Sequence, residues 1–215
     1  MEPVPEKPNE ALRAGAQAVS YLFHPLLLCT YLVMLLGFFM PRFYSIQPSA
    51  LLRFAGFVFV MTCILPVANL AMLKSVGSLK SWHMEDRSER VLPFLLITLI
   101  YAVVTYMFFY KLRTNLNFNK VMILVTAMVM AGTVVTLFQK ISIHSLAMAG
   151  CVGLLLPLNK VEPMGSLMLP TVVMMVLAGL TMSARLYLQV HTLREVMTGA
   201  VAGFSIGFFG MILLF

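Results

Sequence analysis

The sequence predicts an all-α integral membrane protein, a polytopic bundle of six or seven transmembrane helices. Of its 215 residues, 60% are hydrophobic and 11% are charged, whereas soluble domains carry about 25% charged residues. The hydrophobic residues form blocks of about 20, the length that a helix needs to cross a bilayer core roughly 30 Å thick. Helices are expected because backbone amides in lipid must be hydrogen bonded within their own segment. The alternation typical of a β-barrel is not visible.

Seven apolar blocks follow one another along the chain. A polar lead-in over residues 1–17 precedes a single transmembrane domain over residues 18–215. The blocks are expected at about 19–40, 51–73, 93–110, 121–138, 146–158, 167–183 and 196–215. If the first block does not cross the membrane completely, the number of spans is six and the N-terminus lies on the other side.

Prolines and polar residues mark the ends and bends of these blocks. His24-Pro25 predicts a kink or an interfacial turn in the first block, and Pro66 predicts a bend in the second. Pro93 is expected to open the third helix, because proline is well tolerated in a first helical turn. The fifth block is short unless its helix begins near Ser142.

Small residues inside the blocks are expected to serve packing. Four glycines recur every three or four residues in the last block and permit close contact between helices: Gly199, Gly203, Gly207 and Gly210. The three cysteines lack the spacing of a zinc site or a disulfide framework and are expected to be buried hydrophobic residues: Cys29, Cys63 and Cys151.

The formal net charge of +7 would suggest a nucleic-acid partner in a soluble protein. In a membrane protein, basic residues that flank the spans face anionic headgroups or an anionic substrate. The membrane is therefore the expected partner, and nucleic acid is not.

Three polar clusters interrupt the apolar sequence, at residues 80–90, 140–144 and 185–195. Two apolar blocks separate the first cluster from the second, and two more separate the second from the third. Since an even number of crossings returns the chain to the same side, all three clusters are predicted to emerge at one membrane face. Ionisable residues near lipid are costly and are functional candidates by default.

Together the clusters hold the groups needed to transfer a phosphoryl group without a metal ion. Lysine and arginine stabilise the charge on phosphate oxygens, and a neutral histidine can attack phosphorus. Glu195 follows His191 by four residues, so on a helix the two would lie on one face. A carboxylate there would fix the histidine tautomer. His144 is the histidine available to protonate a leaving alkoxide.

Each cluster also has a purely structural interpretation. The cations of the first cluster would then be ordinary loop residues, and His144 would be hydrogen bonded between helices. Arg185 and Glu195 would form a structural ion pair.

The three clusters resemble the motifs of the type-2 phosphatidic acid phosphatase superfamily, K-x6-R-P, P-S-G-H and S-R-x5-H-x3-D. The first motif is similar to KSWHMEDR at 80–87 and the second to ISIH at 141–144. The third is similar to Arg185, His191 and Glu195 with their spacing. The resemblance covers roughly residues 74–215, and the third motif is its most specific part.

The resemblance implies a role for each matching residue. Phosphate oxygens would be held by Lys80, Arg87, Ser142 and Arg185. His191 would be the nucleophile, His144 the general acid and Glu195 the residue that orients His191. No cofactor and no metal ion would be needed.

Several positions depart from the motifs. Ser88 replaces the proline of the first motif, and Ile141 and Ile143 replace the proline and glycine of the second. Ala184 stands in place of the serine of the third motif, and Glu195 replaces its aspartate. These departures favour a divergent member with an altered substrate or a degenerate site.

The resemblance implies a membrane-embedded phosphatase whose substrate is a lipid phosphate or a polyprenyl diphosphate. Its site would face away from the cytoplasm, in the inner membrane of a bacterium. The sequence does not indicate an oligomeric state.

Two alternatives stay open. One is a metal-dependent lipid phosphate transferase, in which the acidic cluster of Glu85, Asp86 and Glu89 would bind Mg²⁺. The other is a non-catalytic protein, which would be a degenerate phosphatase, a scaffold or a transporter.

Overall fold

The structure is a computed structural model that describes residues 10–79, 87–161 and 167–215, without the side chains of residues 87, 88 and 161. Within these ranges the chain is all-α, as predicted. Its helical segments are α1 (Glu10–Leu22), α2 (Pro25–Phe39), α3 (Pro41–Tyr44), α4 (Pro48–Phe59), the π-helical turn η1 (Val60–Ile64), α5 (Leu65–Ser75), α6 (Arg87–Tyr106), the π-helical turn η2 (Met107–Lys111), α7 (Leu116–Phe138), α8 (Ile143–Val161), α9 (Met168–Tyr187) and α10 (Leu193–Leu214).

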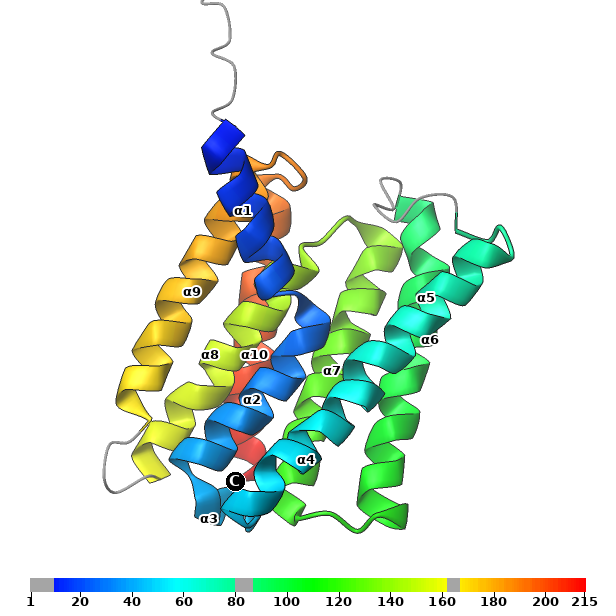
Figure 1. Cartoon of the computed structure of the whole chain (residues 1–215). Helices are drawn as coiled ribbons and strands as arrows, with labels where there is room; N and C mark the ends of the chain where they lie inside the picture. Colours follow the sequence, from blue (N-terminus) through cyan, green and yellow to red (C-terminus); the bar gives the residue numbers. More distant parts are fainter. Residues whose placement is uncertain (1–9, 80–86, 162–166) are drawn as a thin grey trace, which may run out of the picture.

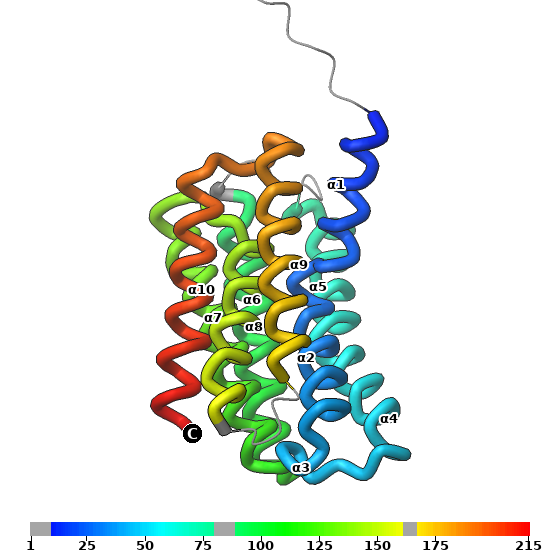
Figure 2. Tube along the Cα trace, turned by 90° about the vertical axis from the view of Figure 1, so that its left-hand side faces the viewer, coloured from blue at the N-terminus to red at the C-terminus, as the bar shows by residue number. Residues whose placement is uncertain are grey.

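The long helices form one bundle with their axes roughly aligned (Figures 1 and 2). Six helices in the described ranges are long and apolar enough to cross a membrane, and the bent pair α1–α2 would make a seventh span. This confirms the prediction of a polytopic helical membrane protein with six or seven spans. One end of the bundle holds α1, the end of α5, the start of α6, and the α7–α8 and α9–α10 connections (Figure 1). The C-terminus lies at the opposite end.

The first apolar block is not one straight helix. Helices α1 and α2 meet at an angle of 62°, because Pro25 has no N–H to continue the α-helical hydrogen bonds. The N–H of His24 instead donates to the carbonyl of Tyr21 at 3.3 Å. In a continuous helix that N–H would bind the carbonyl of Ser20, which is therefore free for another donor. The predicted boundary between lead-in and domain, at residues 17 and 18, falls inside α1.

One of the two proline predictions is wrong, and the other, a bend at Pro66, stays a prediction. Pro66 lies in the first turn of α5, directly after the π-helical turn η1. Proline has no N–H to donate to the carbonyl four residues before it, and a π-helical turn changes the hydrogen-bond register so that the helix can continue past it. Pro93 does not open its helix, because α6 already begins at Arg87. Arg90 is therefore part of α6.

The core at the end opposite α1 is built largely from aromatic side chains. Tyr44, Phe108 and Phe118 are almost completely buried, and Phe118 packs edge-to-face against both of the others. Aromatic side chains bury large areas and prefer this geometry. The core therefore joins α3, η2 and α7 below the polar end of the bundle.

Helices α8 and α10 approach each other more closely than side chains would allow. A Cβ atom on Gly203 would overlap the carbonyl oxygen of Leu146, and one on Gly207 would overlap that of Gly150. At the polar end of this contact, the N–H of Ser142 donates to the carbonyl of Glu195 at 3.2 Å. The glycines thus bring the first turns of the two helices side by side, which confirms the predicted role of the glycine series in close helix contact.

We expect Gly203→Ala to lower the stability of the protein, because the added methyl group meets backbone that cannot rotate away. Overpacking of this kind costs about 1–3 kcal/mol. The measurement is thermal unfolding of the purified protein in detergent. Gly179→Ala in α9 is the matched control, since nothing lies within 4 Å of the added Cβ. Equal unfolding temperatures for the two variants would contradict the close contact.

Candidate active site

His191 and Glu195 form a hydrogen-bonded pair at the start of α10. His191 Nδ1 lies 2.6 Å from Glu195 Oε2, and the side chains are 5% and 18% exposed. The helix begins only at Leu193, with Thr192 as its N-cap, whose hydroxyl accepts from the N–H of Glu195 at 3.3 Å. This cap fixes the backbone of Glu195. In a capping box the glutamate side chain would bind the backbone N–H of the N-cap residue, whereas the carboxylate of Glu195 contacts His191.

This contact determines which nitrogen of His191 can react. Since a carboxylate accepts, Nδ1–H donates to Glu195 and the lone pair of a neutral imidazole is on Nε2. Burial lowers the pKa of His191 below its ordinary value of 6.5, and the charges of Arg185 and Arg90 lower the pKa further. The hydrogen bond and the charge of Glu195 oppose this decrease. At neutral pH His191 is therefore an uncharged imidazole with a fixed tautomer.

His144 lies in the first turn of α8 and is held by α1. Its Nε2 lies 3.1 Å from the carbonyl oxygen of Ser20, the carbonyl that the break between α1 and α2 leaves free. Because a carbonyl only accepts, Nε2–H is the donor, and Nδ1 is the nitrogen that can exchange a proton with a ligand. The broken first span thus positions a histidine that lies more than 100 residues further along the chain.

Arg185 lies in the last turn of α9, and its Nε is buried without a hydrogen-bond partner among the described residues. Unpaired buried donors of charged groups are costly. A guanidinium with a free donor is suited to receive the oxygens of an anion. Arg90 of α6 faces the same cavity.

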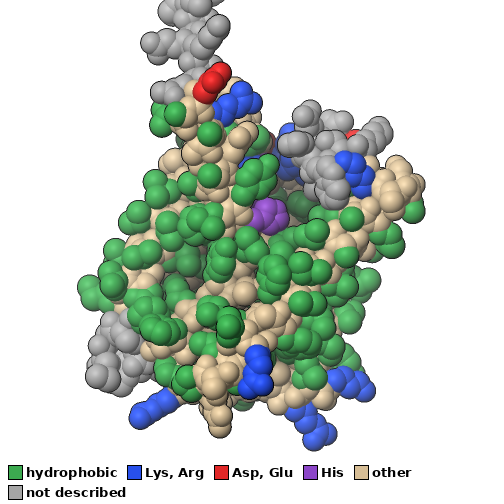
Figure 3. All heavy atoms as spheres, viewed as in Figure 1, with side chains coloured by type: hydrophobic (Ala, Val, Ile, Leu, Met, Phe, Trp, Pro, Cys, Tyr) green, Lys and Arg blue, Asp and Glu red, His purple; other side chains and the backbone are tan. Residues whose placement is uncertain are grey.

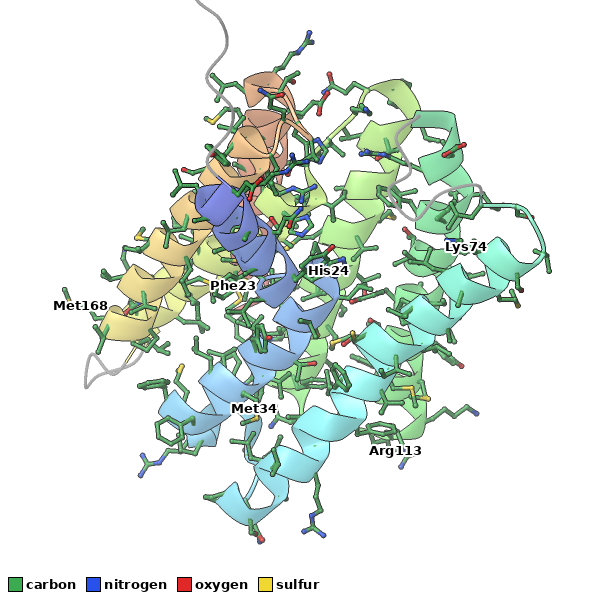
Figure 4. The ribbon with its side chains drawn as sticks, turned by 45° about the horizontal axis from the view of Figure 1, so that its top comes forward. Phe23, His24, Met34, Lys74, Arg113 and Met168 are labelled. Carbon is green, nitrogen blue, oxygen red and sulfur yellow. The ribbon has the colours of Figure 1, made fainter. Side chains whose placement is uncertain are left out.

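One cavity of about 240 Å³ joins these groups. Its basic lining residues among those described are His24, Arg90, His144, Arg185 and His191. Figure 3 shows a histidine in a hollow on the face between α2 and α5, and Figure 4 shows His24 where α1 meets α2. The rings of His24 and His144 lie edge-to-face with centroids 5.4 Å apart. Two arginines and three imidazoles with no carboxylate among the described lining residues make this cavity a site for an anion.

The structure brings together four of the seven residues that the sequence singled out: Arg185, His144, His191 and Glu195. Ser142 lies beside them but is completely buried, and its hydroxyl accepts hydrogen bonds from the N–H and the hydroxyl of Ser145. It caps α8 and does not line the cavity. Lys80 and the side chain of Arg87 lie outside the described residues.

Two residues that line the cavity were not predicted as site residues. His24 was interpreted only through the turn at Pro25, and its position near α8 depends on the 62° bend. Its Nδ1 accepts from the N–H of Leu26 at 3.4 Å and caps α2. Arg90 lies in the polar interval before Pro93, where the third helix was expected to begin, and one of the interpretations made the cations of this interval ordinary loop residues. The run VLPFLLITLI that follows Arg90 is almost entirely apolar, so it gives no signal for where the helix begins before Pro93.

Two further predictions concern metal and cysteine. The described residues contain no group of three or more His, Cys, Asp or Glu side chains placed to hold a metal ion. Glu85 and Asp86, the acidic pair of the metal-dependent alternative, lie outside the described residues. All three cysteines are buried and free, as predicted.

A titration of the four histidines by NMR, with ¹⁵N-labelled imidazoles, measures the tautomer and pKa of His191. We expect a pKa below 6.5, because burial and the two arginines disfavour the imidazolium. Glu195→Gln removes the charge that raises the pKa, so the pKa should decrease further. His191→Gln assigns the signal. A pKa of His191 above 6.5 in the native protein, or a higher pKa of His191 in the Glu195→Gln variant, would contradict the described geometry.

No model of a known protein family matches this chain, and no curated protein or solved structure matches it either. The resemblance to the type-2 phosphatidic acid phosphatase superfamily therefore rests on the three motifs in the sequence.

Proposed function

We propose that the protein is a membrane-embedded phosphatase that removes phosphate from a lipid phosphate or diphosphate through a phosphohistidine intermediate. The observation that carries this proposal is the meeting of two groups in one cavity. His191 presents a neutral Nε2, fixed by Glu195, and Arg185 presents a buried donor without a partner among the described residues. A nucleophile next to an unsatisfied cation suits an electrophile that carries negative charge, and a phosphate ester is such a group.

In the first step, His191 Nε2 attacks phosphorus and forms a P–N bond while the bond from phosphorus to the alkoxide breaks. Arg185 and Arg90 stabilise the charge on the phosphoryl oxygens. The alkoxide takes a proton from Nδ1 of a protonated His144, whose Nε2–H stays on the carbonyl of Ser20. Protonation of the buried His144 would require the negative charge of the bound phosphate beside it.

In the second step, the neutral His144 takes a proton from water at Nδ1 while the water oxygen attacks phosphorus. The P–N bond breaks, phosphate leaves, and His191 returns as a neutral imidazole. His144 is again protonated, so the cycle consumes one water and produces one alcohol and one phosphate. Glu195 supports both steps because it holds Nδ1–H of His191 and stabilises the positive charge on the phosphorylated ring.

We infer that the site faces away from the cytoplasm, in the inner membrane of a bacterium, as the resemblance implies. The C-terminus lies at the end of the bundle opposite the site (Figure 1). It would then lie in the cytoplasm, where a fused reporter enzyme detects its position.

Substitution of the site residues tests the proposal with purified protein and a panel of lipid phosphates in the presence of EDTA. We expect His191→Ala to lower phosphate release by at least about 10³-fold, because it removes the nucleophile. His144→Ala should lower it by about 10²–10⁴-fold through loss of the acid. Arg185→Ala and Arg90→Ala should each lower it by about 10²–10³-fold through loss of charge stabilisation.

Lys160→Ala is the matched control, since Lys160 is exposed at the opposite end of α8. Its phosphate release should equal that of the native protein. Thermal unfolding of each variant separates loss of chemistry from loss of fold. Full activity of His191→Ala would exclude the mechanism, and an absence of phosphate release from all substrates would favour a non-catalytic protein.

A further inference from the structure

The cavity that holds the ionisable groups continues into the apolar interior of the bundle. Beyond His144, its wall is formed by apolar side chains of α2, α6, α7 and α8, among them Leu28, Ile97, Val125 and Leu154. Leu154 follows His144 by ten residues on α8, which corresponds to about 15 Å along the helix axis. This is half of the roughly 30 Å hydrocarbon core of a bilayer, so the cavity is as deep as one leaflet.

The polar atoms in this inner wall already have partners. The hydroxyl of Tyr101 donates to the carbonyl of Thr62 at 2.9 Å. The hydroxyl of Thr133 lies 2.7 Å from that of Thr98 and 3.1 Å from the carbonyl of Val129. A buried water needs two to four polar partners, and apolar cavities without them stay dry. The inner cavity therefore suits hydrocarbon better than water.

The shape of the cavity limits how much hydrocarbon it can take. Its volume of about 240 Å³ extends over about 15 Å of helix, which makes it a narrow channel. It is smaller than the roughly 300–1,000 Å³ of common ligand pockets. One chain fits such a channel better than two.

The cavity is reached from a face of the bundle that a lipid would touch. Leu70 of α5 lines it, together with His24 between α1 and α2 and Leu26 in the first turn of α2. Figure 3 shows the surface hollowed on this face, with a histidine in the hollow. A lipid in the adjoining leaflet has its phosphate at the polar end of the bundle and its chain directed inward, as the cavity does.

We propose that the inner cavity binds a single hydrocarbon chain of the substrate inside the protein, while the phosphate of that substrate lies against Arg185 and His191. The substrate class is thus an amphiphile with one chain that the protein encloses. In a substrate with two chains, the second would stay in the surrounding lipid. The position of the phosphate rests on the proposed function, whereas the enclosure of the chain does not require turnover.

Binding of alkylphosphonates, which cannot be hydrolysed at the P–C bond, tests the enclosed chain without turnover. Affinities for a series from methyl- to octylphosphonate are obtained from ligand-induced shifts in thermal unfolding. We expect the affinity of the native protein to increase with chain length by up to about fourfold for each methylene, because each is removed from water. Equal affinity for methyl- and octylphosphonate would overturn the proposal.

Variants that fill the inner cavity provide the structural test. Cys151 and Val125 line it from α8 and α7, so Cys151→Phe and Val125→Phe should bind methylphosphonate normally and lose the gain with chain length. Ala102→Phe is the matched control, since Ala102 is exposed on α6. If one cavity variant does not fold, the other decides. Retention of the chain-length gain in a folded cavity variant would overturn the proposal.

The result also separates this inference from the proposed function. Chain-length-dependent binding that the cavity variants abolish, without any turnover of alkyl phosphates, would support the enclosed chain and reject the phosphatase. Turnover that is independent of chain length and unchanged in both cavity variants would support the phosphatase and reject the enclosed chain.

Discussion

The close contact between α8 and α10 is the constraint on which the site depends. Because Gly203 and Gly207 of α10 carry no side chain, their backbone lies directly against the carbonyls of Leu146 and Gly150 on α8. The two helices therefore start side by side, and the N–H of Ser142 reaches the carbonyl of Glu195. This places two helix N-termini, each with partial positive charge, at the same end of the bundle. Such ends favour phosphate groups, so packing inside the membrane and the electrostatics of the site have one origin.

The site gathers positive charge where a membrane protein has little means to compensate it. Arg90 and Arg185 line the cavity, and the Nε of Arg185 is buried without a hydrogen-bond partner among the described residues. Buried charge without a partner is costly and is found where function requires it. An anion in the cavity would offset that cost. Burial lowers the pKa of His191, and the charges of the two arginines lower it further. The arginines that attract a phosphate therefore also favour the neutral, reactive form of the nucleophile.

The parts of the site that the sequence could predict are those set by local spacing. The contact of His191 with Glu195 was predicted from their separation of four residues and is present, but the assumed reason was wrong, because His191 precedes α10 and Thr192 caps the helix between them. The glycine spacing of α10 likewise predicted a close helix contact. His24 and Arg90 could not be predicted in this way, because one depends on the bend between α1 and α2 and the other on where α6 begins. The cap that Ser142 provides for α8 depends on Ser145 and on the neighbouring helix, and motif resemblance alone assigned it to phosphate. The roles of His24, Arg90 and Ser142 therefore depend on tertiary structure, which local sequence spacing does not show.

The most direct measurement of the central claim is the isolation of a phosphorylated protein during turnover. The purified protein is mixed with a ³²P-labelled lipid phosphate and quenched with alkali, which preserves phosphohistidine. The account predicts one labelled site, at His191, and no label in His191→Gln. Label at another residue, or phosphate release at the native rate by His191→Gln, would contradict it.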